Sequence, residues 1–284
     1  MITVLEAIKL STDFLQKKGI ESARTNAEML LAYVLNCKRL ELYLQFDRPL
    51  KENELNIYRN VIKRRSNFEP LQYIIGSVEF YGMKFKVSRA VLIPRPETEL
   101  LVETILAVLK KTEKYSILDI GCGSGCIGIT LTVNLLSKKV ICTDNSEKAI
   151  ELAKENSQLH DVDSKINFVQ HDIISQPINF VDDVDVVVSN PPYIAKSEFD
   201  LLQQEIKNFE PRQALTDDAD GYTFFEAICS KSIRILKKGG MLFFEISEGQ
   251  SSAVKKIMQE YSYSEINTIK DYQQIDRVIY GVKK

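Results

Sequence analysis

Hydrophobic positions in the first quarter of the chain recur at the spacing of amphipathic helices. From Ser22 to Asn36 they fall three or four residues apart, and the same spacing returns over residues 55–62. An earlier helix is expected over about Val4 to Lys17, ended by Gly19. We therefore predict a small helical domain over residues 1–75.

The pattern changes in the next segment. Residues Val78–Val87 alternate around Gly82 and predict a β-hairpin. Two prolines in Leu92–Pro96 exclude regular structure there, and Pro96 suits the first turn of a helix that reaches about Lys111. We expect residues 76–94 to be a hairpin linker between the helical domain and the remainder.

Beyond Tyr115, short apolar runs alternate with helical patterns. Strands are expected over 116–120, 140–143, 166–169, 184–189 and 241–246. Helices are expected over 126–136, 146–159, 224–236 and 251–261. The last runs, 264–269 and 277–282, have no helix between them and are expected to pair as an antiparallel edge. Such alternation is typical of an α/β, Rossmann-like domain, which we assign to residues 95–284.

Composition and charge limit the possible classes of protein. The chain is 44% hydrophobic and 27% charged, as soluble globular proteins are, and its formal net charge of -2 does not favour non-specific nucleic-acid binding. The basic triplet Lys63-Arg64-Arg65 is interpreted as a solvated helix end. No signal pattern occupies Met1–Glu6, and no apolar run approaches the ~20 residues that span a bilayer. Five irregularly spaced cysteines indicate free thiols in a reducing, cytoplasmic compartment.

A glycine-rich turn follows the first strand of the predicted sheet. Glycines in Gly121–Gly125 permit a sharp turn and close approach of a ligand, and the next helix offers free N–H groups. These features predict a nucleotide-like ligand, and the spacing of Gly123, Gly125 and Gly128 also fits a dinucleotide. Asp119 argues against a pyrophosphate, because a carboxylate repels phosphate but can hold the ammonium of a methionine moiety. A capping role for Asp119 is the competing interpretation.

Acidic residues also end the next two strands. Asp144 can accept hydrogen bonds from both hydroxyls of a ribose, since Asn145 and Ser146 are available to cap the following helix. Asp172 can accept from an adenine amino group, although an ordinary turn role remains equally open. No metal site is expected, because Cys122 and Cys126 lack a second cysteine pair and the chain has only two histidines, neither assigned to catalysis.

The strand over 184–189 stops abruptly at Asn190-Pro191-Pro192-Tyr193. The prolines end strand pairing and fix φ, so the segment is a rigid polar tip beside the predicted ligand. The Asn190 side-chain oxygen and the Pro191 carbonyl can each accept one N–H of a planar NH₂ group, while Tyr193 packs on it. Held in this way, a poor nitrogen nucleophile faces the methyl carbon of S-adenosylmethionine in line. An ordinary proline turn is the competing interpretation.

Six segments also carry a family resemblance. They are Pro70–Gly76, Glu79–Gly82, Leu92–Glu99, Asp119–Gly125, Asn190–Tyr193 and Glu210–Arg212. In them, and over nearly its whole length, the chain resembles the peptide chain release factor glutamine methyltransferases, the HemK or PrmC family. The resemblance implies a class I methyltransferase that transfers a methyl group from S-adenosylmethionine to the glutamine amide nitrogen of the release-factor Gly-Gly-Gln motif. S-adenosylhomocysteine would be the product.

The resemblance also implies roles for individual residues. The expected cofactor-binding residues are Asp119, Gly121, Cys122, Gly123, Ser124, Gly125, Asp144, Asp172, Ile173 and Asn190. The expected catalytic residues are Asn190, Pro191, Pro192 and Tyr193. Two positions depart from the family pattern: Ser247 replaces a glycine after Glu245-Ile246, and Ile173 stands where an aromatic ring often stacks on adenine. The helical domain is expected to recognise the release factor, and we expect a monomer without membrane or nucleic-acid partners.

Three other functions share some of these sequence features. A nucleic-acid amino methyltransferase acting on adenine or guanine would use the same tetrapeptide but needs a basic groove or a target-reading domain. A non-catalytic S-adenosylmethionine-binding regulator is disfavoured by the intact Asn190-Pro191, and an oxidoreductase by the lack of a proton relay. Residues 194–223 are expected to cover the site as a loop. Whether Arg95, Glu97 and Arg212 brace it or form surface ion pairs stays open.

Overall fold

Residues 2–110 and 112–284 are described by a computed structural model, in which they form two units. The smaller unit contains the chain up to Ser77 together with Gln203–Phe209. The larger unit contains Val78–Leu202 and Glu210–Lys284. The expected linker is therefore not a separate element, because its hairpin belongs to the larger unit. The sequence also gave no sign that residues 203–209 join the helices of the smaller unit.

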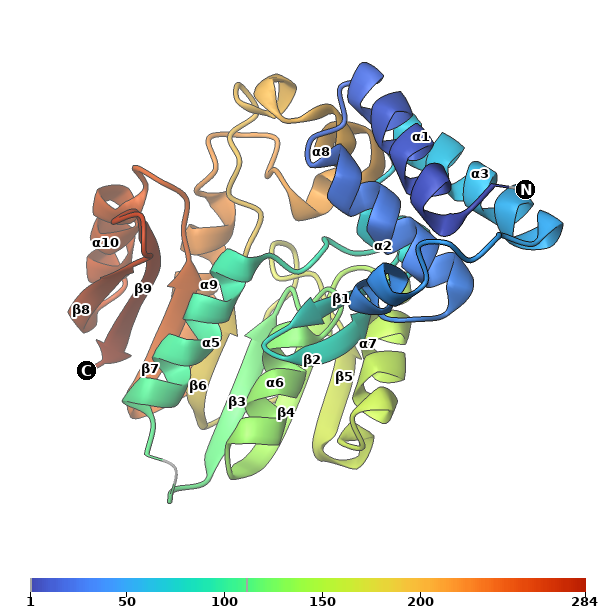
Figure 1. Cartoon of the computed structure of the whole chain (residues 1–284). Coiled ribbons are helices and arrows are strands. Elements are labelled where there is room, and N and C mark those ends of the chain that lie inside the picture. Colours follow the sequence, from blue (N-terminus) through green and yellow to red (C-terminus); the bar gives the residue numbers. More distant parts are fainter. Residues whose placement is uncertain (1, 111) are drawn as a thin grey trace. The chain divides into compact units, whose positions relative to one another are not determined.

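The smaller unit is built from helices (Figure 1). They are α1 (Val4–Lys17), α2 (Ala23–Leu35), η1 (Arg39–Leu44), α3 (Glu52–Ser66), α4 (Leu71–Ile75) and α8 (Gln204–Phe209). Helix α1 begins at a capping box, in which the Thr3 side chain accepts from Glu6 N–H and the Glu6 carboxylate accepts from Thr3 N–H. Apolar faces of α1, α2 and α3 form one buried cluster, as their spacing predicts.

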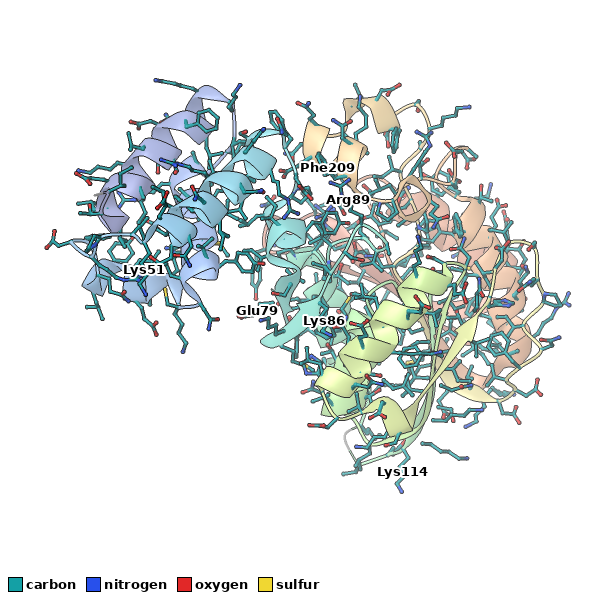
Figure 2. The ribbon with its side chains drawn as sticks, turned by 90° about the vertical axis from the view of Figure 1, so that its right-hand side faces the viewer. Lys51, Glu79, Lys86, Arg89, Lys114 and Phe209 are labelled. Carbon is teal, nitrogen blue, oxygen red and sulfur yellow. The ribbon has the colours of Figure 1, made fainter. Side chains whose placement is uncertain are left out.

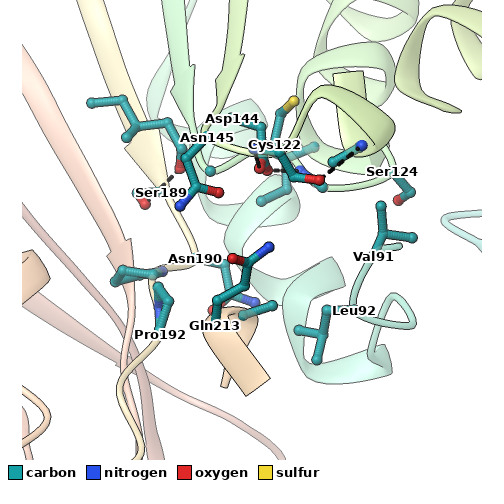
Figure 3. A pocket seen from close by; sticks show the side chains of 18 of the residues that line it. Val91, Leu92, Cys122, Ser124, Asp144, Asn145, Ser189, Asn190, Pro192 and Gln213 are labelled. Atoms are coloured by element: carbon teal, nitrogen blue, oxygen red, sulfur yellow. Dashed lines mark hydrogen bonds between the residues drawn. The ribbon is translucent and has the colours of Figure 1, made fainter. Parts of the chain in front are cut away.

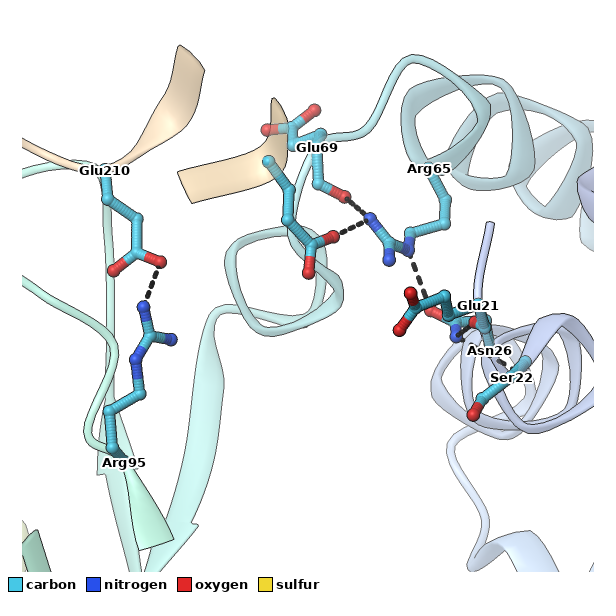
Figure 4. Close-up of polar contacts among 8 residues, drawn as sticks. Glu21, Ser22, Asn26, Arg65, Glu69, Arg95 and Glu210 are labelled. Carbon is cyan, nitrogen blue, oxygen red and sulfur yellow. Dashed lines mark hydrogen bonds and ion pairs between the residues drawn. The ribbon is translucent and has the colours of Figure 1, made fainter. Parts of the chain in front are cut away.

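Arg65 lies inside the smaller unit. Its side chain donates to Asn26 Oδ1 over 2.7 Å and to the Glu69 carbonyl over 3.0 Å, and it forms an ion pair with Glu205 of α8 over 2.7 Å (Figure 4). Arg64 makes a two-pronged contact with the Glu69 carboxylate. The interpretation of the basic triplet as a solvated helix end is therefore wrong for Arg65, which is only 6% exposed.

The predicted hairpin is formed by β1 (Ser77–Phe80) and β2 (Met83–Lys86). Tyr81 and Gly82 both have positive φ, as a tight two-residue hairpin turn requires. Figure 2 labels Lys86, whose Nζ forms an ion pair with Glu155. Asn156 exchanges two hydrogen bonds with the Lys86 backbone and donates a third to the Ser124 carbonyl. One buried amide thereby fixes the hairpin to the glycine-rich turn.

The larger unit contains a sheet with the strand order β5-β4-β3-β6-β7-β9-β8. Its strands are β3 (Tyr115–Ile120), β4 (Ser137–Asp144), β5 (Ile166–Gln170), β6 (Val184–Ser189), β7 (Leu236–Glu245), β8 (Tyr263–Lys270) and β9 (Asp276–Lys283). Strands β3 to β7 are parallel, while β9 runs antiparallel to both of its neighbours. The predicted α/β class and its antiparallel edge are confirmed.

Helices cover both faces of this sheet (Figure 1). They are α5 (Pro96–Val108), α6 (Cys126–Asn134), α7 (Glu147–Leu159), α9 (Thr223–Ile235) and α10 (Ser251–Glu260), with short turns η2 (Asp163–Lys165), η3 (Phe199–Leu201) and η4 (Arg212–Ala214). Apolar residues of α5, α6 and α7 share one buried cluster, and those of α9 and α10 share another. Alternate residues of β3 enter alternate clusters, Ile117 the first and Leu118 the second. The expected end of α5 at Lys111 lies outside the described residues.

The strand order reverses between β3 and β6, which are hydrogen-bonded neighbours. In parallel sheets, ligands bind in the crevice outside the carboxyl ends of the strands at such a reversal. Ile120 pairs with Ser189 at these ends, and the Ser189 hydroxyl donates to the Ile120 carbonyl over 2.7 Å. Gly121 and Asn190 follow directly. No helix within the described ranges is long and apolar enough to span a bilayer.

Candidate active site at the strand reversal

A pocket opens at the reversal between β3 and β6 (Figure 3). Its empty volume, which includes the space at its open mouth, is about 980 Å³. The predicted site residues that line it are Gly121, Cys122, Gly123, Ser124, Asp144, Asp172, Ile173, Asn190, Pro191 and Pro192. Asp119, Gly125 and Tyr193 are not among the lining residues. The topology thus brings together segments that are 70 residues apart in sequence.

Glycines shape the turn after β3. Gly121, Gly123 and Gly125 have φ values of +73°, +55° and +80°, which side chains rarely permit. Gly125 is the N-cap residue of α6, and a Cβ there would lie 2.8 Å from Ile129 Cδ1. Gly125, expected to contact the cofactor, is therefore needed for packing beneath the pocket. Gly121 and Gly123 form its wall.

Asp119 lies directly beneath this turn. Its Oδ2 accepts a 3.0 Å hydrogen bond from Gly128 N–H, while Oδ1 is buried without a hydrogen-bond partner among the described residues. Burial raises the pKa of Asp119 to about 7, the Gly128 hydrogen bond opposes the rise, and the charge of Asp144 adds to it. The competing capping role is thus present in the structure. The remaining oxygen is one that a cationic group would satisfy.

Asp144 projects from the end of β4 into the pocket wall. Its Oδ2 accepts from Gly123 N–H and its Oδ1 from Ser146 N–H, both over 2.9 Å. Ser146 itself caps α7, because its hydroxyl accepts from Ala149 N–H. Burial raises the pKa of Asp144, and the two backbone hydrogen bonds oppose the rise. Each carboxylate oxygen keeps a second lone pair, so the pair of oxygens can still accept from two adjacent hydroxyls.

Asp172 mainly organises its own turn. Its Oδ1 accepts from Ile174 N–H over 2.9 Å, and its Oδ2 accepts from the Ser175 hydroxyl over 2.6 Å. These hydrogen bonds lower the pKa of Asp172, the Ser175 hydroxyl most. The turn role, left open by the sequence, is therefore present, and Asp172 also lines the pocket.

Lys231 of α9 holds the turn that follows Asp172 in place. Its ammonium donates to three backbone carbonyls, those of Ile173, Ile174 and Gln176. Burial lowers the pKa of Lys231, and Asp172 opposes that change. The apolar Ile173 of this turn and Phe224 of α9 both line the pocket. Two apolar side chains and a hydrogen-bonded turn suit a flat heterocycle such as adenine.

Asn190 is oriented by a neighbour on α5. Its Nδ2 donates to Thr98 Oγ1 over 3.2 Å, and Thr98 is 2% exposed. Pro191 and Pro192 follow on the pocket wall. With Nδ2 committed to Thr98, the Oδ1 of Asn190 remains as an acceptor.

Tyr193 points away from the pocket wall. Its hydroxyl donates to Glu245 Oε1 over 3.1 Å, and its carbonyl accepts from Gln250 Nε2 over 3.0 Å. A Cβ at Gly221 would lie 2.5 Å from that carbonyl. Burial raises the pKa of Tyr193, and the charge of Glu245 adds to the rise. The expectation that Tyr193 packs on the target group therefore differs from the structure, in which Tyr193 anchors the tetrapeptide.

Arg95 joins two segments at the pocket mouth. Its guanidinium pairs with Glu210 Oε1 over 2.5 Å, and Glu210 Oε2 accepts from Ile93 N–H (Figure 4). Arg95 lines the pocket, so it braces this site.

Arg212 and Glu97, unlike Arg95, are not among the residues that line the pocket. Arg212 pairs with Asp218 and lies over the Phe199 ring at 3.9 Å, and both members of the ion pair are largely exposed. Arg212 therefore folds the loop after the tetrapeptide onto itself and is not a pocket residue. Glu97 is exposed, and its charge acts on the buried Glu245.

Sequence reasoning missed several pocket residues. Val91, Leu92 and Gln213 line the pocket (Figure 3), as do Thr98 and Phe224. Leu92 and Thr98 fall inside a segment that carries the family resemblance, which was a usable signal. Gln213 and Phe224 come from the long loop and the helix after it, where no local pattern indicates proximity to β3.

The pocket residues fit S-adenosylmethionine. Asp144 in the pocket wall suits ribose hydroxyls, and Asp119, which lies beneath the pocket and does not line it, has an unsatisfied carboxylate oxygen that suits an ammonium. Asn190 presents an acceptor at the opposite side of the glycine-rich turn. The arrangement can hold a cofactor and a planar NH₂ group in one cavity.

Comparisons with known proteins agree with this geometry. The family of the PrmC N-terminal domain matches residues 6–76, and the methyltransferase small domain matches residues 96–217. The release factor glutamine methyltransferase of Chlorobaculum tepidum is 38% identical, over 97% of this chain and 95% of that protein. The protein of the same name from Fusobacterium nucleatum is 39% identical, over 98% of this chain and 78% of that protein.

A solved structure shares the fold. The methyltransferase from Pyrococcus furiosus superposes with a TM-score of 0.55 at 16% identity, over 72% of this chain and 90% of that one. With relatives of such identity along almost its full length, the chain belongs to the release factor glutamine methyltransferase family.

Proposed function

We propose that this protein transfers the methyl group of S-adenosylmethionine to the side-chain amide nitrogen of the glutamine in the Gly-Gly-Gln motif of translation release factors. One observation carries the proposal: the Asn190-Pro191 acceptors line the same pocket as the glycine-rich turn and Asp144. Family membership supplies the class of substrate. The modified protein would act in translation termination.

The chemistry needs acceptors more than a base. A glutamine amide nitrogen is a poor nucleophile because its lone pair is delocalised into the carbonyl. Asn190 Oδ1 and the Pro191 carbonyl would each accept one N–H, which turns the nitrogen lone pair towards the methyl group. S-adenosylmethionine supplies an activated methyl group on a sulfonium. The new N–C bond forms as the C–S bond breaks, S-adenosylhomocysteine leaves, and the nitrogen releases one proton to solvent.

The cofactor would lie across the carboxyl ends of three strands. Asp119 would hold the ammonium, Gly121 and Gly123 would flank the methionine portion, and Asp144 would accept from the ribose. Ile173 would pack on the adenine. Dipoles of the two acceptor carbonyls would stabilise the positive charge that develops on the target nitrogen.

The partner and compartment follow as further parts of the proposal. The smaller unit, matched by the PrmC N-terminal domain, would recognise the release factor. We place the enzyme in the cytoplasm as a monomer without a nucleic-acid partner, consistent with its formal net charge of -2 and five free cysteines. A nucleic-acid amino methyltransferase is the less favoured alternative.

Mass spectrometry of a modified release factor tests the proposal. The protein is incubated with S-adenosylmethionine and a purified release factor, and the Gly-Gly-Gln peptide should gain the mass of one methyl group. Asn190→Ala should abolish this gain while calorimetry still detects cofactor binding. Asn179→Ala, on an exposed loop, is the control. An unmodified peptide, with methylation of DNA or RNA in parallel reactions, would transfer the assignment to the alternative.

A further inference from the structure

The two ends of an asparagine amide have nearly the same shape but opposite hydrogen-bonding roles. If Asn190 were turned by 180°, its NH₂ would face the NH₂ of the target, and neither group could accept. Substrate contact alone cannot prevent this before the substrate binds. A fixed partner in the free protein is needed.

Thr98 is that partner in the structure. Asn190 Nδ2 donates to Thr98 Oγ1 over 3.2 Å, and Thr98 is buried at the start of α5. A hydroxyl can accept or donate, however, so Thr98 fixes the amide only if its own proton is directed elsewhere.

Glu245 offers the acceptor for that proton. It is 2% exposed at the end of β7, and Tyr193 donates to its Oε1. Its Oε2 is buried and has no hydrogen-bond partner among the described residues. Burial raises the pKa of Glu245, and the nearby Thr98 and Tyr193 hydroxyls oppose that rise. The carboxylate thus accepts the Tyr193 hydroxyl at Oε1, and its buried Oε2 is an unsatisfied acceptor for a second hydroxyl among the described residues.

We propose that Glu245 and Thr98 are positioning residues, which together hold the Asn190 amide with Oδ1 towards the substrate nitrogen. Glu245 draws the Thr98 proton, Thr98 can then only accept from Asn190 Nδ2, and Oδ1 is left facing the pocket. The same carboxylate anchors Tyr193 at the other end of the tetrapeptide. The inference rests on the proposed function for its catalytic consequence, but the orientation of the amide can be measured without it.

Replacement of Thr98 tests the orientation. Thr98→Val keeps the shape but removes the hydroxyl, and should lower kcat/KM for the release factor by about 10-fold or more, since lost oriented groups in active sites cost up to about 10²–10³. Thr98→Ser should stay within about threefold. The cofactor dissociation constant should not change. Thr104→Val is the matched control, because Thr104 is also buried on α5 and its hydroxyl donates to the Leu100 carbonyl of the same helix.

The Asn190→Asp variant is a second background, in which an effect of Thr98 on side-chain orientation can be separated from an effect on packing. In Asn190→Asp both ends of the side chain are acceptors, so its orientation no longer matters. Adding Thr98→Val to Asn190→Asp should therefore cost less than about threefold, although the same change costs tenfold beside asparagine. Equal losses in both backgrounds, or a Thr98→Ser variant as impaired as Thr98→Val, would overturn the inference.

Nuclear magnetic resonance gives a readout independent of turnover. The Asn190 side-chain NH₂ signals, identified by their loss in Asn190→Asp, should show one proton protected from solvent exchange in the wild type and in Thr98→Ser. Thr98→Val and Glu245→Gln should lose this protection. Protection that persists in Thr98→Val refutes the inference, whereas a protected amide in a protein that methylates no release factor refutes only the proposed function.

Discussion

Asp119 Oδ2 accepts a hydrogen bond from the backbone N–H of Gly128, nine residues later, over 3.0 Å. This contact joins the end of β3 to the first turn of α6, and the other carboxyl oxygen has no hydrogen-bond partner in the described part of the chain. The N-terminus of α6 and the buried carboxyl group of Asp119 thus meet beneath the glycine-rich turn.

Cofactor affinity should depend on pH through Asp119. The pKa of Asp119 is raised to about 7 in the cofactor-free protein. A bound ammonium favours the ionised carboxylate, so binding below pH 7 must release a proton. The affinity for S-adenosylmethionine should therefore weaken as the pH falls below 7, by up to about tenfold per unit. Calorimetry between pH 5.5 and 8.5 measures the slope, and Asp119→Asn should bind weakly with no slope.

The same substitution should stabilise the free protein. Because the pKa of Asp119 is raised above its usual 3.8 on folding, the folded state holds a proton that the unfolded state releases. Ionised Asp119 therefore destabilises the fold increasingly as the pH rises from about 4 to about 7. At pH 8, without cofactor, Asp119→Asn should unfold at a higher temperature than the wild type. A lower melting temperature at pH 8 would contradict the buried charge.

Lys231→Met should weaken cofactor binding, although Lys231 is not among the residues that line the pocket. The ammonium holds three carbonyls of the turn that carries Ile173. Its loss leaves those carbonyls without their donor and loosens the adenine side of the pocket, for an expected decrease in affinity of roughly tenfold. Lys255→Met, on the exposed face of α10, is the control. Equal affinities in the two variants would show that the turn does not depend on Lys231.

Gly128→Ala should destabilise the larger unit. A Cβ at this position would collide with Cys142 Sγ and lie 3.1 Å from Asp119 Oδ2. Overpacking of this kind costs about 1–3 kcal/mol of unfolding free energy. Adding Cys142→Ala removes the colliding sulfur and should restore part of the loss. Urea unfolding of the two single variants and the double variant gives the coupling energy, which should be clearly non-zero.

Arg65→Met should loosen the segment 203–209. Arg65 is buried with Asn26, Glu69 and Glu205, so its removal leaves polar groups in the smaller unit without their partner. Hydrogen exchange should accelerate in residues 203–209 and the melting temperature should fall. Glu205→Gln should have a smaller effect, because the Glu205 side chain is 32% exposed. Unchanged exchange in Arg65→Met would contradict the grouping of α8 with the N-terminal helices.

The sequence predicted local elements well where the apolar spacing was regular. Helix α1 has the expected bounds, Val4–Lys17, and β6 has the expected bounds, Val184–Ser189. Strand β7 starts earlier than expected, at Leu236, because Lys237–Gly240 extend the strand without an apolar pattern. Periodicity indicates which face is buried, and it says little about polar residues that continue an element.

The sequence predicted those residues of the candidate site that come directly after strands. Asp144 and Asn190 come directly after strands, so parallel pairing alone brings them to the pocket. Thr98, Gln213 and Lys231 come from helices and a loop, and only tertiary packing decides where their side chains point. For the same reason the sequence did not show that Tyr193 turns to Glu245.

The interleaving of the two units limits how this chain can be divided. Residues 203–209 belong to the N-terminal helices, although the residues on both sides of them belong to the larger unit. A single cut after Ser77 would leave this short helix exposed on the catalytic fragment, without the buried arginine that holds it. Exchange of the smaller unit between relatives therefore requires two grafts, one at each place where the chain enters it.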